Sequence, residues 1–293
     1  MRFYGLLLAF LLFAAPAVAD DDVAKHVFLG KTEVELPQIL GFKEILGQND
    51  EFDKLAKQFV PPENKLLAVY LSYDDVAAMK ENAAAGFKKY ILVQTTNNDV
   101  TISSPADFAV IKDEIVSETG GSLKSNVEAQ QQLDSASKFI HDNYHQTSKL
   151  QIGETKSLGA FMDSDNIIGV SILANMGVQS QDGAQDLPIA ASLSALELKD
   201  KVLFVSVYSN YGGADDADFV RQTAKEYARL AYAANGSAAP SEVTPAKPDD
   251  SALEDSILNF TLGAVGIAMF AVVTLWLGPL LLKTLRRKKD ETV

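Results

Sequence analysis

The feature that most constrains this chain is an apolar run near its C-terminus. Ile257–Leu282 contains no charged residue. At about 1.5 Å per helical residue, a run of this length can cross a hydrocarbon core about 30 Å thick. Five basic residues follow within 283–293, and such clusters favour the cytoplasmic side of a membrane. The sequence therefore predicts a transmembrane helix over 257–282 and a basic cytoplasmic tail over 283–293.

The N-terminus predicts export of everything before that helix. Arg2 precedes the apolar stretch Phe3–Ala15, and Ala17–Ala19 is a small-x-small motif suited to signal cleavage. Residues 1–19 are therefore predicted to be a secretory signal peptide, with an uncleaved anchor as the alternative. Together, the two ends predict a single-pass protein whose N-terminal domain is exported and whose C-terminus is cytoplasmic.

The absence of cysteine narrows both the compartment and the chemistry. A chain without Cys has no disulfide, no thiolate metal site and no Cys nucleophile. An exported domain without disulfides is more typical of a bacterial periplasm than of an endoplasmic reticulum, so we expect a bacterial inner-membrane location. Residues 20–256 contain 20 Lys and Arg against 37 Asp and Glu. Such an excess of negative charge does not favour nucleic acid as a partner.

A flexible linker is predicted between the exported domain and the membrane. Residues 235–256 contain Pro240, Pro245 and Pro248 among Ala, Ser and acidic residues. Such a segment has too few apolar side chains to form a core, and its flexible reach is about 25 Å. Residues 20–234 are then one exported domain, because no similar linker interrupts them.

Within that domain, the hydrophobic period alternates between strand and helix values. The turn residues Asp163–Asn166 and Lys199-Asp200 join neighbouring strand patterns and predict hairpins. Consecutive strands joined by short turns, with helices in groups, predict an α+β fold with a mostly antiparallel sheet. The predicted strands are Thr32–Leu36, Leu66–Ser72, Tyr90–Thr96, Lys156–Met162, Ile167–Ala174, Leu187–Leu196 and Val202–Tyr208. The predicted helices are Asp50–Phe59, Pro105–Gly120, Ser125–Gln146 and Phe219–Ala234, and Asp74–Gly86 is predicted to be a helical turn and a loop.

The apolar stripe of each long helix predicts the face that it buries. Ser104 is expected to cap the helix that starts at Pro105. The expected stripes are Phe108, Ile111, Ile115 and Val116 in that helix, Val127, Leu133, Ala136, Ile140 and Tyr144 in the next, and Phe219, Thr223, Tyr227, Leu230 and Ala231 in the last.

The order of elements resembles that of the PsbP/DcrB-like exported α+β proteins. The residues that carry this resemblance are Leu187–Tyr208, a long hairpin, Asp218–Ala234, the helix after it, and Pro105–Glu118, an inner helix. The resemblance implies a small exported helper or binding protein, associated with a membrane assembly and without catalysis of its own. Fold alone does not fix function.

Two histidines form a candidate metal site. His141 and His145 are four residues apart, which places both on one helix face. The segment resembles the zincin motif with Asp142 where that motif has Glu, and no downstream motif marks a third ligand. The alternative is a solvated helix face, and the same holds for His26 near the mature N-terminus.

Two acidic clusters have structural explanations. Asp215, Asp216 and Asp218 are expected to cap the last helix, and Asp163 and Asp165 are typical turn residues. The chain contains neither the Gly-x-Ser-x-Gly motif nor a phosphate-binding glycine motif. We therefore expect a binding, scaffolding or assembly module without cofactor, whose partner is a membrane complex or a periplasmic protein. The alternatives are a metal-dependent hydrolase using His141 and His145, and a lipid or small-ligand binding protein.

Overall fold

The computed structural model describes residues 24–61, 63–81, 87–97, 100–120, 127–144, 148–180 and 183–237. The predicted signal peptide, transmembrane helix and tail, and all but the first three residues of the linker, lie outside these residues. The described part confirms the α+β class and the mostly antiparallel sheet.

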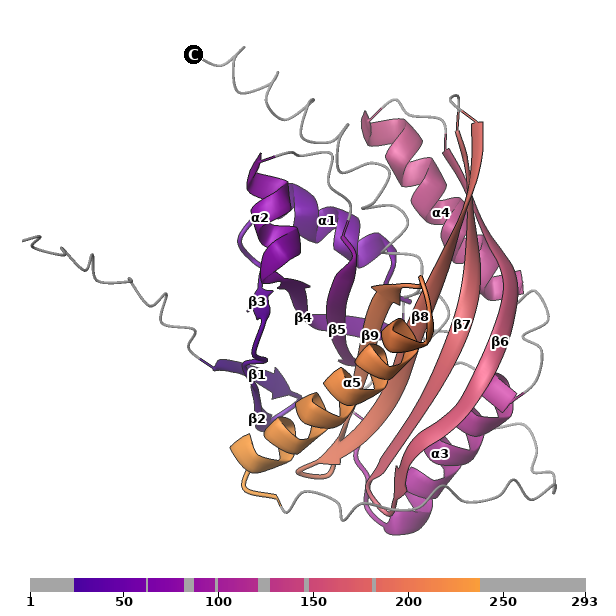
Figure 1. Ribbon diagram of the computed structural model, residues 1–293. Coiled ribbons are helices and arrows are strands. Elements are labelled where there is room, and N and C mark those ends of the chain that lie inside the picture. Colours follow the sequence, from indigo (N-terminus) through magenta and orange to yellow (C-terminus); the bar gives the residue numbers. More distant parts are fainter. Residues whose placement is uncertain are drawn as a thin grey trace, which may run out of the picture.

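Seven strands form one antiparallel sheet in the order β3-β4-β5-β9-β8-β7-β6 (Figure 1). The last four follow one another along the chain as a meander, while β5 pairs with β9 and so joins the two halves of the chain. The bounds are β3 Phe42–Glu44, β4 Asn64–Ser72, β5 Lys89–Thr96, β6 Ser148–Ser164, β7 Ile167–Ser180, β8 Gly183–Leu198 and β9 Lys201–Asn210.

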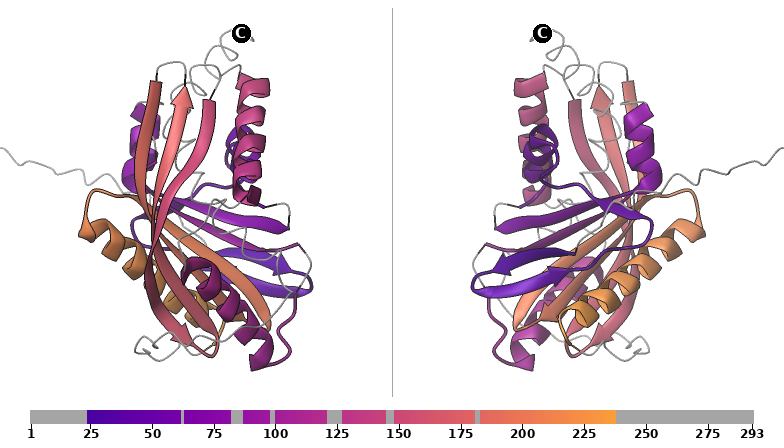
Figure 2. Two further views of the ribbon diagram at one scale, coloured as in Figure 1. Left: turned by 90° about the vertical axis from the view of Figure 1, so that its right-hand side faces the viewer. Right: turned by 90° about the vertical axis from the view of Figure 1, so that its left-hand side faces the viewer.

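Both faces of this sheet are covered, as the two side views in Figure 2 show. One face packs against α1 (Asp50–Gln58), α3 (Pro105–Gly120) and α4 (Val127–Tyr144). The other face packs against α5 (Ala214–Ala234) and a separate hairpin of β1 (Lys25–Leu29) and β2 (Thr32–Leu36). Two-sided burial explains why β4, β5 and β9 are nearly continuous apolar runs.

The C-terminal strands are longer than their apolar patterns predict. β6 contains 17 residues, β7 14 and β8 16, because their polar outer portions continue the same antiparallel pairing. The predicted turn at Lys199-Asp200 is confirmed by positive φ angles of 51° and 64°, which suit a two-residue hairpin. The sequence did not predict β1 and β3. Near Asp74 it predicted only a helical turn, whereas the structure contains the nine-residue helix α2 (Tyr73–Glu81).

The buried faces of two helices differ from the predicted stripes. In α3, Phe108, Ile111 and Ile115 are buried as predicted, but Val116 is 41% exposed. In α5, the helix begins earlier and its core face is rotated, so that several small residues contact the sheet and allow close packing. The buried residues of α5 are Ala217, Val220, Ala224, Tyr227, Ala228, Ala231 and Tyr232, whereas Phe219, Thr223 and Leu230 are only partly buried.

The end of α5 is joined to the N-terminal hairpin through Asn235. Its side-chain amide donates to the Glu35 carbonyl at 2.8 Å, and its side-chain oxygen accepts from the Glu35 N–H at 3.0 Å. The same amide also donates to Ala231 O at 2.8 Å and so caps the helix. One side chain thereby connects the two ends of the described chain.

A buried carboxylate, Asp75, connects α2 to the start of β5. It is 3% exposed and its Oδ2 accepts from the Lys88 N–H at 3.1 Å, the Lys89 N–H at 2.9 Å and the Ser72 hydroxyl at 2.8 Å. Ser72 Oγ in turn accepts from the Asp75 N–H at 3.1 Å, which caps α2.

Replacing Asp75 with Ala should destabilise the protein by about 1–3 kcal/mol, because the two N–H groups before β5 lose their acceptor. The matched control is Asp74→Ala, which removes the exposed neighbouring carboxylate and should cost less than about 0.5 kcal/mol. Urea unfolding of both variants measures the difference. Equal midpoints for the two variants would show that the Asp75 hydrogen bonds contribute nothing to stability.

Candidate functional site

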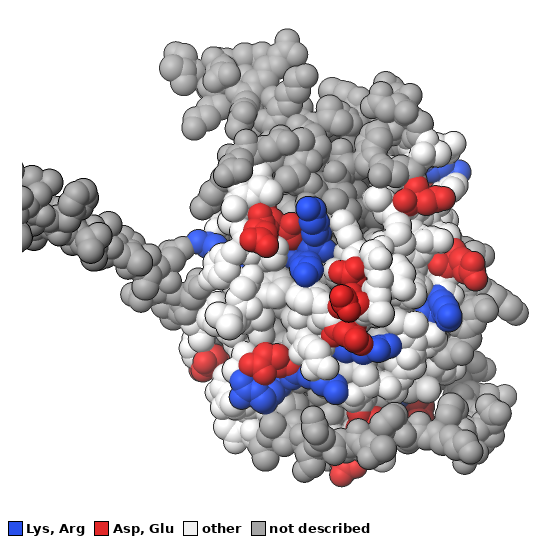
Figure 3. Space-filling model, in the orientation of Figure 1, with Lys and Arg blue, Asp and Glu red and all other residues white. Residues whose placement is uncertain are grey.

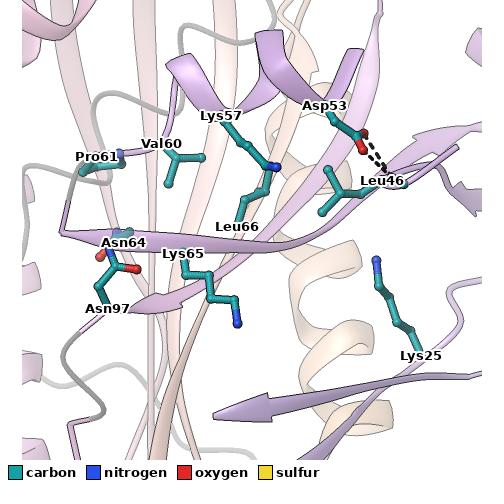
Figure 4. A pocket seen from close by; sticks show the side chains of 11 residues that line it. Lys25, Leu46, Asp53, Lys57, Val60, Pro61, Asn64, Lys65, Leu66 and Asn97 are labelled. Atoms are coloured by element: carbon teal, nitrogen blue, oxygen red, sulfur yellow. Dashed lines mark hydrogen bonds between the residues drawn. The ribbon is translucent and has the colours of Figure 1, made fainter. Parts of the chain in front are cut away.

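The candidate site is a groove beside the first half of β4, between α1, the segment after β3 and β1. Its cavity volume is about 610 Å³. Figure 4 shows that its lining side chains come from segments far apart in the sequence. The lining residues are Lys25, Leu46, Gly47, Asp53, Lys57, Val60, Pro61, Asn64, Lys65, Leu66 and Asn97.

The groove exists because β3 covers only one end of β4. β3 pairs with Tyr70–Ser72, and the last contact is the Ile45 N–H donating to the Val69 carbonyl at 2.9 Å. The chain then turns away from β4. Asn64–Ala68 consequently has a strand partner only on its β5 side.

Two carboxylates hold this turn in place. Glu44 Oε1 accepts from the Leu46 N–H at 3.1 Å, and the Asp53 carboxylate on α1 accepts from the Gly47 N–H at 3.0 and 2.9 Å. Gly47 has φ of +92°, a value that favours glycine. Asp53 therefore both lines the groove and fixes the turn beside it.

The open edge of β4 presents backbone hydrogen-bonding groups to the groove. The Asn97 N–H donates to the Glu63 carbonyl at 2.7 Å, so the antiparallel alternation directs the backbone of Asn64 and Leu66 away from β5. The Asn64 N–H donates to the Pro61 carbonyl at 2.9 Å. The backbone groups of Leu66 have no such partner among the described residues, and they face the groove.

The groove is locally positive on a negatively charged chain. Its lining contains three lysines and one aspartate, whereas the whole chain has a net charge of −13. Lys25 is paired with Glu44 at 2.8 Å. Lys57 extends from α1 toward β4 and Lys65 extends from β4 itself, and neither forms an ion pair with a described residue. On the face seen in Figure 3, by contrast, acidic and basic residues are interspersed.

The lining suits binding of an anion that also carries apolar groups. Leu46, Val60 and Leu66 supply an apolar wall beside the lysines, and the amide of Asn64 is held by Gln94 Oε1 at 3.2 Å. The described lining residues include no histidine and no hydroxyl nucleophile. Charge attraction combined with an apolar wall favours a ligand or segment that is acidic but not wholly polar.

Only one of the two predicted histidines lies in the described part of the chain. His141 is exposed in the last turn of α4, and His145 lies outside the described residues. Within the described part of the chain, no three His, Asp or Glu side chains gather where they could hold a metal ion. His26 lies in β1, with its Nδ1 3.1 Å from Glu33 Oε1.

The acidic cluster near α5 has internal partners. Asp215 and Asp216 lie inside the first turn of the helix rather than before it, and the N-cap is Gly213, so the capping prediction is corrected. The Asp216 carboxylate accepts from the Gly212 N–H at 2.7 Å and the Ser209 hydroxyl at 3.2 Å. Asp218 pairs with Arg221 at 3.3 Å. The turn residue Asp163 is paired with Lys112.

Buried tyrosines form a second group of polar side chains that the sequence did not single out. Tyr90 and Tyr208 stack with ring centroids 4.7 Å apart, and Tyr70 and Tyr227 meet edge to face at 6.0 Å on the other side of the sheet. Burial raises the pKa of the Tyr208 and Tyr227 hydroxyls well above their ordinary value. These hydroxyls are therefore neutral core groups, remote from proton transfer near neutral pH.

No protein-family model matches this chain, and no curated protein matches it either. Among the described helices, none is both long and apolar enough to span a membrane, and the predicted span Ile257–Leu282 lies outside the described residues.

The histidine pair gives a clear prediction. Replacing His141 and His145 together with Ala should change the free energy of unfolding by no more than about 0.5 kcal/mol, as for side chains that hold no structural metal. We also expect no stoichiometric zinc in protein purified without chelator, measured by inductively coupled plasma mass spectrometry. Stoichiometric zinc that the double variant loses would establish the metal site and favour the hydrolase alternative.

Proposed function

We propose that this protein is a membrane-anchored periplasmic binding or assembly module without catalysis, and that the groove beside β4 is its binding surface. The observation that carries the proposal is the pair Lys57 and Lys65, which line the groove beside the open edge of β4 and form no ion pair with a described residue. Cations of this kind supply attraction for an acidic ligand, and the apolar wall beside them supplies contact area. The bound group is then an acidic segment of a membrane or periplasmic protein.

The membrane part of the proposal is supported by the sequence. Ile257–Leu282 has the length and composition of a transmembrane helix, and the basic tail after it favours the cytoplasmic side. The described domain ends near Ser237, so about twenty residues separate it from the bilayer. A flexible segment of this length lets the groove reach partners within a few tens of ångströms of the membrane surface.

The topology is testable with a reporter that is active only in the periplasm. Fused after Asn235, the reporter should be active, because the signal peptide exports the preceding domain. Fused after Val293, it should be silent. Activity of the second fusion and silence of the first would reverse the topology and remove the periplasmic assignment.

The binding surface is testable by charge reversal in the full-length protein. Lys57→Glu with Lys65→Glu should reduce the recovery of specific co-purifying proteins at least tenfold, quantified by mass spectrometry after cross-linking in membranes. The reason is that the reversal replaces attraction by repulsion at the groove. The matched control is Lys149→Glu with Lys156→Glu, two exposed lysines of β6 at the opposite edge of the sheet.

The control variant should keep the wild-type set of partners. Equal losses in both variants would mean that general surface charge, and not the groove, governs association. Loss of a small anionic molecule instead of a protein from the groove variant would favour the small-ligand alternative.

A further inference from the structure

We infer that the groove is occupied, in the anchored protein, by the chain's own acidic segment Asp249–Ser256. This inference rests on the proposal that the groove is the binding surface, and it identifies a segment of the same chain as an occupant of that surface. Three properties of the chain support it: the place where it leaves the domain, the length of the connection, and the composition of the segment.

The chain leaves the domain beside the groove. Asn235 hydrogen-bonds both backbone groups of Glu35 in β2. Glu35 is the cross-strand partner of His26 in β1, and the residue next to His26 is Lys25, which lines the groove. Neighbouring strands are about 4.8 Å apart. The connecting segment therefore starts within about two strand spacings of one groove-lining lysine.

The connection is long enough to return to the groove. Eleven residues, 238–248, separate the last described residue from Asp249. A flexible chain of that length has an average end-to-end distance of about 20 Å and a fully extended length of about 40 Å. Both exceed the separation of about two strand spacings between Asn235 and Lys25, so the segment can reach the end of the groove that Lys25 lines.

The segment is complementary to the groove in charge and in backbone chemistry. Asp249–Ser256 contains four carboxylates and one large apolar residue, Leu253. The groove offers Lys57 and Lys65, which have no ion-pair partner among the described residues, beside an apolar wall, and the backbone of Leu66 faces it at the open edge of β4. The prolines of the linker all precede Asp249, so every backbone N–H of the segment can donate to a strand edge.

Tethering makes a weak contact sufficient. Exposed ion pairs are individually weak, so the free peptide should bind only at millimolar concentration. A short flexible tether gives an effective concentration also in the millimolar range, so the segment is docked in a large fraction of molecules. Because the predicted transmembrane helix starts directly after Ser256, docking holds the groove toward the membrane.

The absence of cysteine allows a direct test in the full-length protein. A variant with Asn97→Cys and Ser251→Cys, reconstituted in nanodiscs at one copy per disc, should form an internal disulfide under mild oxidation. The matched control carries Lys149→Cys and Ser251→Cys, which places one thiol on β6 at the opposite sheet edge. We expect the groove pair to cross-link at least tenfold faster than the control pair.

Charge dependence completes the test. Adding Lys57→Glu and Lys65→Glu should slow cross-linking of the groove pair at least fivefold, and changing all four segment carboxylates to Lys in that background should restore it. Equal rates for the groove and control pairs, or a groove rate that ignores both charge changes, would overturn the inference. If the lysine changes reduce partner capture but leave cross-linking of the groove pair unchanged, only the internal occupant is rejected. If they change neither partner capture nor cross-linking, the groove itself is rejected as the binding surface.

Discussion

The structure depends on covering both faces of one antiparallel sheet. A sheet of seven strands with apolar residues on both faces cannot leave either face in water, and the chain supplies the two covers from different parts of its sequence. Three helices inserted between β3 and β6 cover one face. The N-terminal hairpin and α5 cover the other, which makes the first and last elements of the domain neighbours. The β5–β9 pairing then closes the sheet across the insertion.

The same arrangement explains why the candidate site lies at a sheet edge rather than between the layers. Both interiors are filled by aromatic and branched side chains, including the stacked Tyr90 and Tyr208. The β3 edge is different, because a strand of three residues faces one of nine. The carboxylates of Glu44 and Asp53 fix the turn that ends the shorter strand. Edge strands with exposed backbone groups are commonly protected by lysines, so Lys65 also lowers the risk of unspecific strand pairing.

The parts of the fold that a local pattern determines were predictable from the sequence. Continuous apolar runs predicted β4, β5 and β9, and Lys199-Asp200 predicted a hairpin whose geometry is confirmed by both φ angles. The buried face of α5 was not predictable, because small residues such as Ala224 and Ala228 are buried there without adding to a hydrophobic stripe. β3 is three residues long and has no periodicity to detect.

The groove was beyond prediction for a different reason. Its lysines come from β1, α1 and β4, and only the tertiary arrangement brings Lys25 near Lys57 and Lys65. A single lysine in an acidic domain is not unusual in the sequence. That Lys57 and Lys65 have no carboxylate partner among the described residues is known only from the structure. The histidine pair differs in this respect, since its i, i+4 spacing is conspicuous in the sequence although only His141 lies in the described part of the chain.

The two-way hydrogen bonding of Asn235 with Glu35 has a mechanical consequence. Any pull on the chain beyond Ser237 reaches the folded domain at the end of α5, where this side chain couples the helix to β2. The load therefore passes sideways into the N-terminal hairpin instead of peeling α5 from the sheet one turn at a time. Because these hydrogen bonds share the load, we expect a pull at Ser237 to separate α5 and the hairpin before it disturbs the seven-stranded sheet.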